Sequence, residues 1–172
     1  MRDAIVREAL QLYRSGKSAE HYGDGDVADV FNKAGYPGCW QTNDDVPKMV
    51  KKAVQLKAYR TKEKPEPGDL LLFHNQTDRN RNGKSDDWFT GVAIVVETGR
   101  HTHLAVTRTG GQPIKIFISP NGPMVRTYKG TTVNSFVRLP GPHDPLDAQY
   151  LSGQLYAGFI DSEVIVSRRD VK

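Results

Sequence analysis

The sequence predicts an α+β domain in which N-terminal helices pack on one face of an antiparallel β-sheet. Apolar residues recur at helical spacing through residues 3–54, whereas from residue 70 onward they form short runs or alternate with polar residues. Helices followed by strands are typical of the α+β class. The 172 residues suffice for one hydrophobic core. We therefore expect a single domain over residues 1–162 and a C-terminal tail over residues 163–172.

Three amphipathic helices are expected before residue 60. Residues 3–17 carry apolar side chains at helical spacing with charges between them. The run Asp24-Gly25-Asp26 can cap a second helix, which Gly35 ends because glycine readily adopts the left-handed conformation there. A third helix begins near residues 43–45 and tolerates Pro47 in its first turn. Each helix has one apolar stripe, so each should bury one face.

Strands dominate the rest of the chain. Residues 70–73 and 91–96 are apolar runs bounded by turn residues, which is typical of buried strands. Residues 103–108, 114–118 and 133–139 are expected to be further strands, the first of them with one face exposed. Residues 150–160 are apolar with small residues interspersed and should pack back on the sheet.

Composition narrows the possible functions. The net charge is +4, and no cluster of Lys and Arg with interleaved aromatic residues is present, so nucleic-acid binding is not expected. No apolar run approaches the length of a membrane span. One cysteine excludes an intramolecular disulfide. The sequence does not indicate an oligomeric state.

The segment between the first two strands has the spacing of a calcium loop. Oxygen-bearing side chains stand at its first, third, fifth, ninth and tenth places, with Gly83 at the sixth. Alternate residues of a tightly curling loop point inward, and calcium takes six to eight oxygens. The predicted ligands are Asp78, Asn80, Asn82, the backbone carbonyl of Lys84, Asp86 and Asp87.

Two features weaken this pattern. Phe89 stands at the twelfth place, where a helix-loop-helix calcium loop has a bidentate Glu, and strands replace the flanking helices. Three interleaved cations, Arg79, Arg81 and Lys84, lower the local negative charge. A polar hairpin loop rich in Asx turns, without an ion, is the alternative interpretation.

Two motifs give the chain a family resemblance. They are Val30-Phe31-x-x-Ala34-Gly35 at the end of the second helix and Pro65-x-Pro67-Gly68-Asp69-Leu70-Leu71-x-Phe73 at the first strand. With the order of helices and strands, they resemble the papain-like cysteine peptidases and amidases of the NlpC and CHAP type, which cut bacterial cell-wall peptides. The resemblance covers roughly residues 2–139. It implies a papain-like fold and an exported protein, at the cell surface or in the periplasm, whose signal is absent from this chain.

Both catalytic positions of that family depart from its pattern. The resemblance requires a cysteine at the start of the second helix and a histidine at the start of the second strand. Alignment of the motifs places Gly23 in the cysteine position, Asp24 in the adjoining serine position and Gly91 in the histidine position. Without a nucleophile and its base, an acyl-enzyme cannot form. The expected protein is therefore a pseudoenzyme that binds a cell-wall peptide, a glycan or a protein partner.

Two alternatives stay open. Cys39 is the only thiol and, paired with a histidine such as His103, would make the protein an active peptidoglycan peptidase or amidase. Cys39 precedes the third helix by several residues, so activation by the helix dipole is not expected. The second alternative is a calcium-dependent structural or adhesion module of the cell surface.

Overall fold

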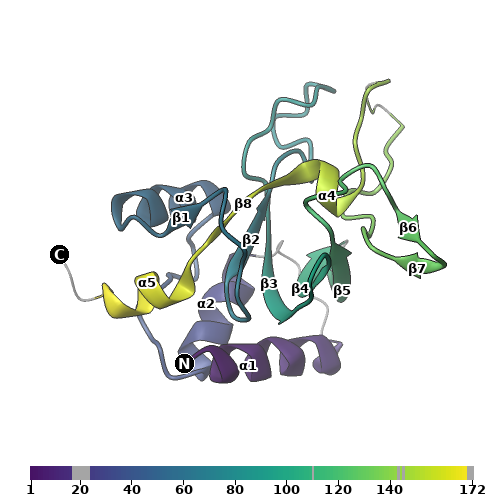
Figure 1. Ribbon diagram of the computed structural model, residues 1–172. Helices are drawn as coiled ribbons and strands as arrows, with labels where there is room; N and C mark the ends of the chain where they lie inside the picture. Colours follow the sequence, from purple (N-terminus) through teal and green to yellow (C-terminus); the bar gives the residue numbers. More distant parts are fainter. Residues whose placement is uncertain (17–23, 110, 143, 145, 170–172) are drawn as a thin grey trace.

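A six-stranded sheet forms the centre of the protein (Figure 1). The computed structural model describes residues 1–16, 24–109, 111–142, 144 and 146–169. The strand order is β1-β8-β2-β3-β4-β5, and every neighbouring pair is antiparallel. The strands are β1 (Tyr59–Arg60), β2 (Leu70–Phe73), β3 (Gly91–Thr98), β4 (His103–Thr109), β5 (Gln112–Ile118) and β8 (Tyr156–Ile160). This mixture of helices and antiparallel sheet agrees with the expected α+β class.

One face of the sheet is covered by four helices. They are α1 (Arg2–Ser15), α2 (Asp24–Lys33), α3 (Val46–Gln55) and α5 (Ser162–Ser167). Their buried side chains form one core cluster with Leu70, Leu72, Val92 and Ile94 of the sheet. The first three helices lie where the sequence predicts them. Their ends have local causes, since Asp45 accepts a hydrogen bond from the Lys48 N–H at the start of α3.

The opposite face is covered by the C-terminal half of the chain. Val137 and Leu155 pack there on Leu71, Phe73 and neighbouring sheet residues, and Leu155 belongs to the short helix α4 (Ser152–Leu155). A small hairpin, β6 (Thr127–Tyr128) and β7 (Thr131–Thr132), projects from this side (Figure 1).

The strand predicted at residues 133–139 does not form. This segment makes only an isolated bridge, between Phe136 and Leu151. The reason lies in Asn134, which is fully buried and accepts a hydrogen bond from the Ser119 N–H. Its amide nitrogen donates to the carbonyls of Gly122 and Val125. The segment therefore closes a loop instead of extending the sheet.

The C-terminal region is integrated into the fold. Residues 156–160, which were expected to pack on the sheet, enter it as β8 between β1 and β2. The structure places α5 where the sequence predicts the start of a tail, and Ile165 of this helix is fully buried. The helix forms because Asp161 caps its first turn and Ile165 completes the helix-side core.

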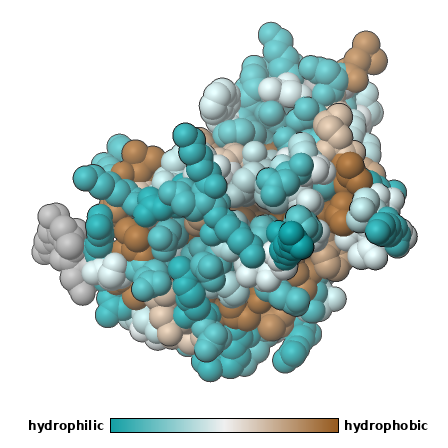
Figure 2. Space-filling view, viewed as in Figure 1, coloured by the Kyte–Doolittle hydropathy of each residue, from teal (hydrophilic) through white to brown (hydrophobic). Residues whose placement is uncertain are grey.

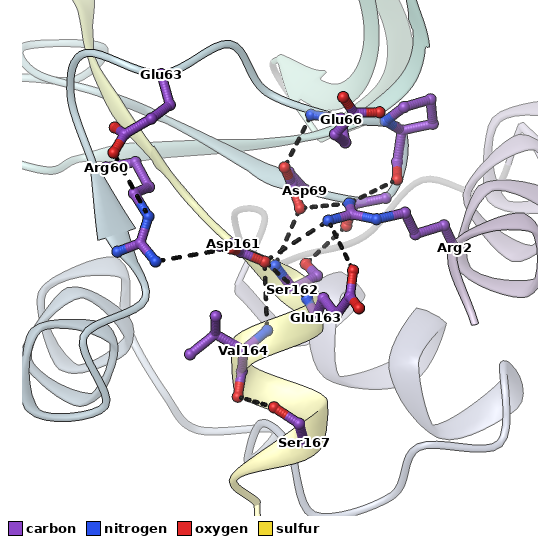
Figure 3. A network of polar contacts seen from close by, with 12 residues as sticks. Arg2, Arg60, Glu63, Glu66, Asp69, Asp161, Ser162, Glu163, Val164 and Ser167 are labelled. Atoms are coloured by element: carbon purple, nitrogen blue, oxygen red, sulfur yellow. Dashed lines mark hydrogen bonds and ion pairs between the residues drawn. The ribbon is translucent and has the colours of Figure 1, made fainter.

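A polar network ties both ends of the chain to β2 (Figure 3). Asp69 is 1% exposed and accepts hydrogen bonds from the Arg2 guanidinium at 2.7 Å and from the Ser162 N–H at 3.0 Å. Arg2 also approaches Asp161 and Glu163 at 3.6 Å. Burial raises the pKa of Asp69, and the surrounding donors satisfy its carboxylate. The network fixes α1 and α5 beside the start of β2.

The face of the molecule shown in Figure 2 is mainly polar. In the view of Figure 2, hydrophilic residues predominate and hydrophobic residues form separate patches. No helix in the described ranges is long and apolar enough to cross a membrane.

Candidate functional site: a cleft beside the β2–β3 loop

A cleft of about 540 Å³ opens at the end of the sheet where β3 begins and β4 ends. This volume lies within the range of small-ligand pockets. The start of α3, the β2–β3 loop, both strands and the segment around residues 137–144 contribute to its walls. The lining residues are Val46, Pro47, Gln76, Thr77, Asp78, Arg79, Arg81, Phe89, Thr90, Gly91, Val92, Thr107, Arg108, Val137, Arg138, Leu139 and Asp144.

Gly91, the first residue of β3, has its side-chain space occupied by Gln76. A Cβ atom added at Gly91 would overlap the Gln76 Oε1 and lie 2.7 Å from its Cδ. Gln76 is held in place by its backbone, since its N–H donates to the Thr90 hydroxyl at 2.8 Å. Gly91 therefore makes room for a glutamine side chain at the position where the family resemblance expects a histidine.

Two buried arginines stiffen the walls of the cleft. The Arg108 side chain is 4% exposed and forms a two-pronged ion pair with Asp26 of α2, whose Nη2–Oδ1 distance is 3.0 Å. The Arg138 side chain is equally buried, pairs with Asp144 and donates to the Asn75 carbonyl at 3.0 Å. The Gly141 N–H and the Arg138 guanidinium lower the pKa of Asp144, which stays ionised. Both buried charges are neutralised within the protein.

The two exposed arginines of the cleft differ in their pairing. Arg79 donates to Asp45, the cap of α3, at 2.9 Å, and so joins the β2–β3 loop to this helix. Arg81 makes no hydrogen bond or ion pair to any residue in the described part of the chain. Arg81 is thus the cation of the cleft that remains available to a ligand.

Four of the predicted calcium ligands converge in the β2–β3 loop. Both oxygens of Asp78 accept backbone N–H bonds, from Asn82 and Gly83. The amide nitrogens of Asn80 and Asn82 donate to Asp86 at 3.0–3.2 Å, which lowers the pKa of that carboxyl. Gly83 has φ +71°, the left-handed conformation that the tight turn requires.

The other two predicted ligands are placed differently. Asp87 is buried and accepts a bond from the Arg79 N–H, while its own N–H donates to the Asn75 side chain. It closes the base of the loop instead of joining the convergent set. The Lys84 N–H donates to Asn82, within the same turn. In the described ranges, no cluster of three or more His, Cys, Asp or Glu residues is present, because two of the four convergent side chains are asparagines.

His74 anchors the other side of the loop's base. Its Nδ1 accepts a hydrogen bond from the Phe89 N–H at 3.0 Å, and its ring lies 4.6 Å from the Phe89 ring and 5.0 Å from the Trp88 ring. Phe89 has φ +52°, a strained conformation for a bulky residue. Burial lowers the pKa of His74, which keeps Nδ1 free to accept.

The thiol and the histidine of the alternative active site lie in different environments. Cys39 is fully buried in the helix-side core beside Trp40. His103 pairs with Thr98, so it stands at the end of β3 and β4 opposite to Gly91 and the cleft. Burial lowers the pKa of His103. Gly23, the expected cysteine position, lies outside the described residues, and the structure brings neither Cys39 nor His103 to the cleft.

Several residues of the cleft have no clear signal in the sequence. The alternating pattern of β4 predicts one exposed face, but Val106, Thr107 and Arg108 are all buried. Asp26 and Arg108 are 82 positions apart, so their pairing depends on the packing of α2 against the sheet. An arginine within an apolar strand is the one sequence feature that indicates a buried ion pair here, although it does not identify the partner. No sequence feature indicates the position of Gln76, because its side chain fills the space that Gly91, which has no side chain, leaves free.

Comparisons with known proteins give no relative for this chain. No family model, no curated protein and no solved structure matches it. The cleft and the β2–β3 loop are therefore the features of the protein that bear on its function.

Proposed function

We propose that the protein is a catalytically degenerate papain-like domain of the NlpC/CHAP type that binds a cell-wall peptide or glycan, or a protein partner, in its cleft. The observation that carries the proposal is the placement of Gln76 in the side-chain space of Gly91. A papain-like reaction needs a base at this point to activate the nucleophile and to protonate the leaving group. A glutamine amide neither gains nor loses a proton at neutral pH, so it cannot act as the base and can serve in binding instead.

The open cleft supports retention of binding after loss of the reaction. Its walls combine apolar side chains with a few polar groups, as small-ligand sites do. Buried ion pairs hold those walls in place before any ligand arrives. A preorganised site binds without the entropic cost of ordering its residues.

The burial of Cys39 argues against an active enzyme with this nucleophile. A thiol acts as its thiolate, and a fully buried site in an apolar core disfavours that charge. The nucleophile would also have no access to a polymeric substrate.

We further propose that the β2–β3 loop binds calcium. Asn80, Asn82 and Asp86 bring their side chains together in this loop, and the carboxylate of Asp78 bonds to the same turn through the Asn82 and Gly83 N–H groups. The amide groups of Asn80 and Asn82 would have to turn their oxygens inward, and amide orientations are assigned from the hydrogen-bond network. The carboxylates and amide oxygens of this set are the hard donors that calcium prefers. Bound calcium would stiffen the wall of the cleft that carries Arg79 and Arg81.

Two assays on purified peptidoglycan test the proposed function. We expect no soluble fragments by mass spectrometry after incubation with the protein, and cosedimentation of the protein with the insoluble wall. Leu139→Asp places a charge on the apolar lining and should reduce cosedimentation. Leu146→Asp makes the same change at a fully exposed residue outside the cleft and should bind as the parent does.

Two results would contradict the proposal. Fragment release by the parent protein, lost in Cys39→Ala, would make it an active enzyme. Equal cosedimentation of the parent and Leu139→Asp would place the binding surface outside the cleft.

A further inference from the structure

We infer that the cleft recognises the carboxyl terminus of a peptide with an apolar last residue, held by Arg81 at the carboxylate and by Gln76 at the last peptide group. This inference rests on the proposed function and names the ligand chemistry of the same cleft. It follows from the pairing of the lining side chains, because groups that already form ion pairs or hydrogen bonds within the protein are not available to a ligand.

The pairing of the arginines in the cleft leaves one cation for a ligand. The lining also contains the carboxylate of Asp78, whose two oxygens are engaged by the Asn82 and Gly83 N–H groups. Arg108, Arg138 and Arg79 form ion pairs with Asp26, Asp144 and Asp45 respectively. Arg81 has no such partner in the ranges that the structure describes.

A single unpaired guanidinium suits a carboxylate. Its planar fork matches the two oxygens of a carboxylate, whereas a phosphate dianion needs more positive charge to compensate its desolvation. The start of α3, which also borders the cleft, adds little for an anion. Pro47 has no N–H group, and the Lys48 N–H is already taken by Asp45.

Gln76 supplies the group that distinguishes a peptide from a simple carboxylate. Its side-chain amide lines the cleft over Gly91 and makes no hydrogen bond to any residue of the described ranges. The amide offers a donor and an acceptor side by side, which matches the N–H and C=O of a peptide group. The Gln76 amide occupies the space that a side chain at Gly91 would fill, so it lies against the first residue of β3.

The rest of the lining favours an apolar side chain. The lining includes the apolar side chains of Val46, Phe89, Val137 and Leu139. The volume of about 540 Å³ accommodates a few residues, not a folded partner. Together with Arg81 and Gln76, this composition favours an apolar peptide end.

A matched pair of peptides tests the inference. The probes are acetyl-Ala-Ala-Leu-Leu with a free carboxylate and the same peptide with a terminal carboxamide, titrated into the full chain and followed by NMR chemical shifts. We expect the acid to bind roughly fivefold more tightly than the amide, the effect of one exposed ion pair. Arg81→Gln should remove this preference without removing the binding of the amide.

The variants separate the two contacts. Gln76→Ala should weaken the acid and the amide by a similar factor, because both contain the last peptide group. Arg100→Gln removes an exposed arginine of the β3–β4 turn, at the other end of the sheet, and should keep the parent's preference.

The outcomes also separate this inference from the proposed function. Equal binding of acid and amide by the parent, or the same preference in Arg81→Gln, would overturn the carboxylate inference while peptide binding in the cleft stands. Binding of neither peptide would overturn it as well, and the cosedimentation of the Leu139 variant would still decide the proposed function independently.

Discussion

Gly91 and Gln76 meet in the lining of the cleft, at the first residue of β3. One residue has no side chain, and the other fills the space left free. Their substitutions should therefore not be independent, since residues in direct contact share interaction energy.

Gly91→Ala should destabilise the protein by about 1 kcal/mol, because the added methyl group displaces the Gln76 side chain into a less favourable rotamer. Gln76→Ala made alone should cost little. The double variant should recover most of the loss of Gly91→Ala. Urea unfolding of the four proteins measures this coupling, and strictly additive free energies would show that the two side-chain positions do not compete.

His74 gives the stability of the loop a dependence on pH. The folded protein lowers the pKa of His74 by burial, so the unfolded chain binds the proton more tightly. Stability from this group is therefore complete above its ordinary pKa of 6.5 and declines as the pH falls through the folded value. Protonation of Nδ1 would also remove the acceptor of the Phe89 N–H. No charged partner of His74 contributes to its shift.

Unfolding midpoints between about pH 7 and about pH 5 test this dependence. His74→Asn keeps an acceptor near the position of Nδ1 and cannot titrate, so it should lose less stability over this range than the parent. His101→Asn, in an exposed turn, should behave as the parent does. His103, whose pKa burial also lowers, contributes equally to all three proteins. Identical losses in the parent and His74→Asn would contradict the prediction.

At the scale of elements, the loop over residues 119–134 depends on one buried amide. Asn134 accepts from the Ser119 N–H and donates to the carbonyls of Gly122 and Val125. Asn134→Asp has nearly the same shape but no amide donor, so both carbonyls lose their partner and a charge is buried.

We expect Asn134→Asp to cost about 3 kcal/mol of unfolding free energy at neutral pH. The loss should shrink as the pH falls and the carboxyl group becomes protonated. Asn43→Asp, an exposed substitution before α3, serves as the control and should change the free energy by less than about 0.5 kcal/mol. A loss as small as that of the control would show that the loop does not depend on the amide of Asn134.

The helices were predictable because their causes are local. Gly16 adopts φ +58° where α1 ends, Gly35 adopts φ +93° where α2 ends, and Asp45 caps α3. The segment 133–139 was not predictable, because alternation does not reveal that Asn134 bonds to a loop instead of to a strand. Of the candidate site, the side chains that meet in the β2–β3 loop, Asn80, Asn82 and Asp86, lie near one another in sequence, and calcium binding by this loop stays a prediction. The cleft unites distant residues, as in the pair Asp26 and Arg108, and was not predicted.

At the scale of the whole molecule, calcium should raise the melting temperature by mass action. A ligand present at 100 times its dissociation constant stabilises the folded state by about 2.7 kcal/mol, which corresponds to roughly 5–10 °C for a chain of this length. Melting in chelator and in excess calcium measures the shift. Asp78→Asn should reduce it, whereas Asp147→Asn, at an exposed residue outside the loop, should preserve it. Coincident melting curves of the parent would refute calcium binding.

The position of β8 also determines when the protein can fold. Residues 156–160 form β8, which lies between β1 and β2 and pairs with both strands. β1 and β2 come from the first half of the chain, and only β8 connects them within the sheet. A growing chain therefore lacks an inner strand until its synthesis has passed residue 160. Until then the edges of β1 and β2 that β8 later covers are open to other chains, and the incomplete chain is prone to aggregate.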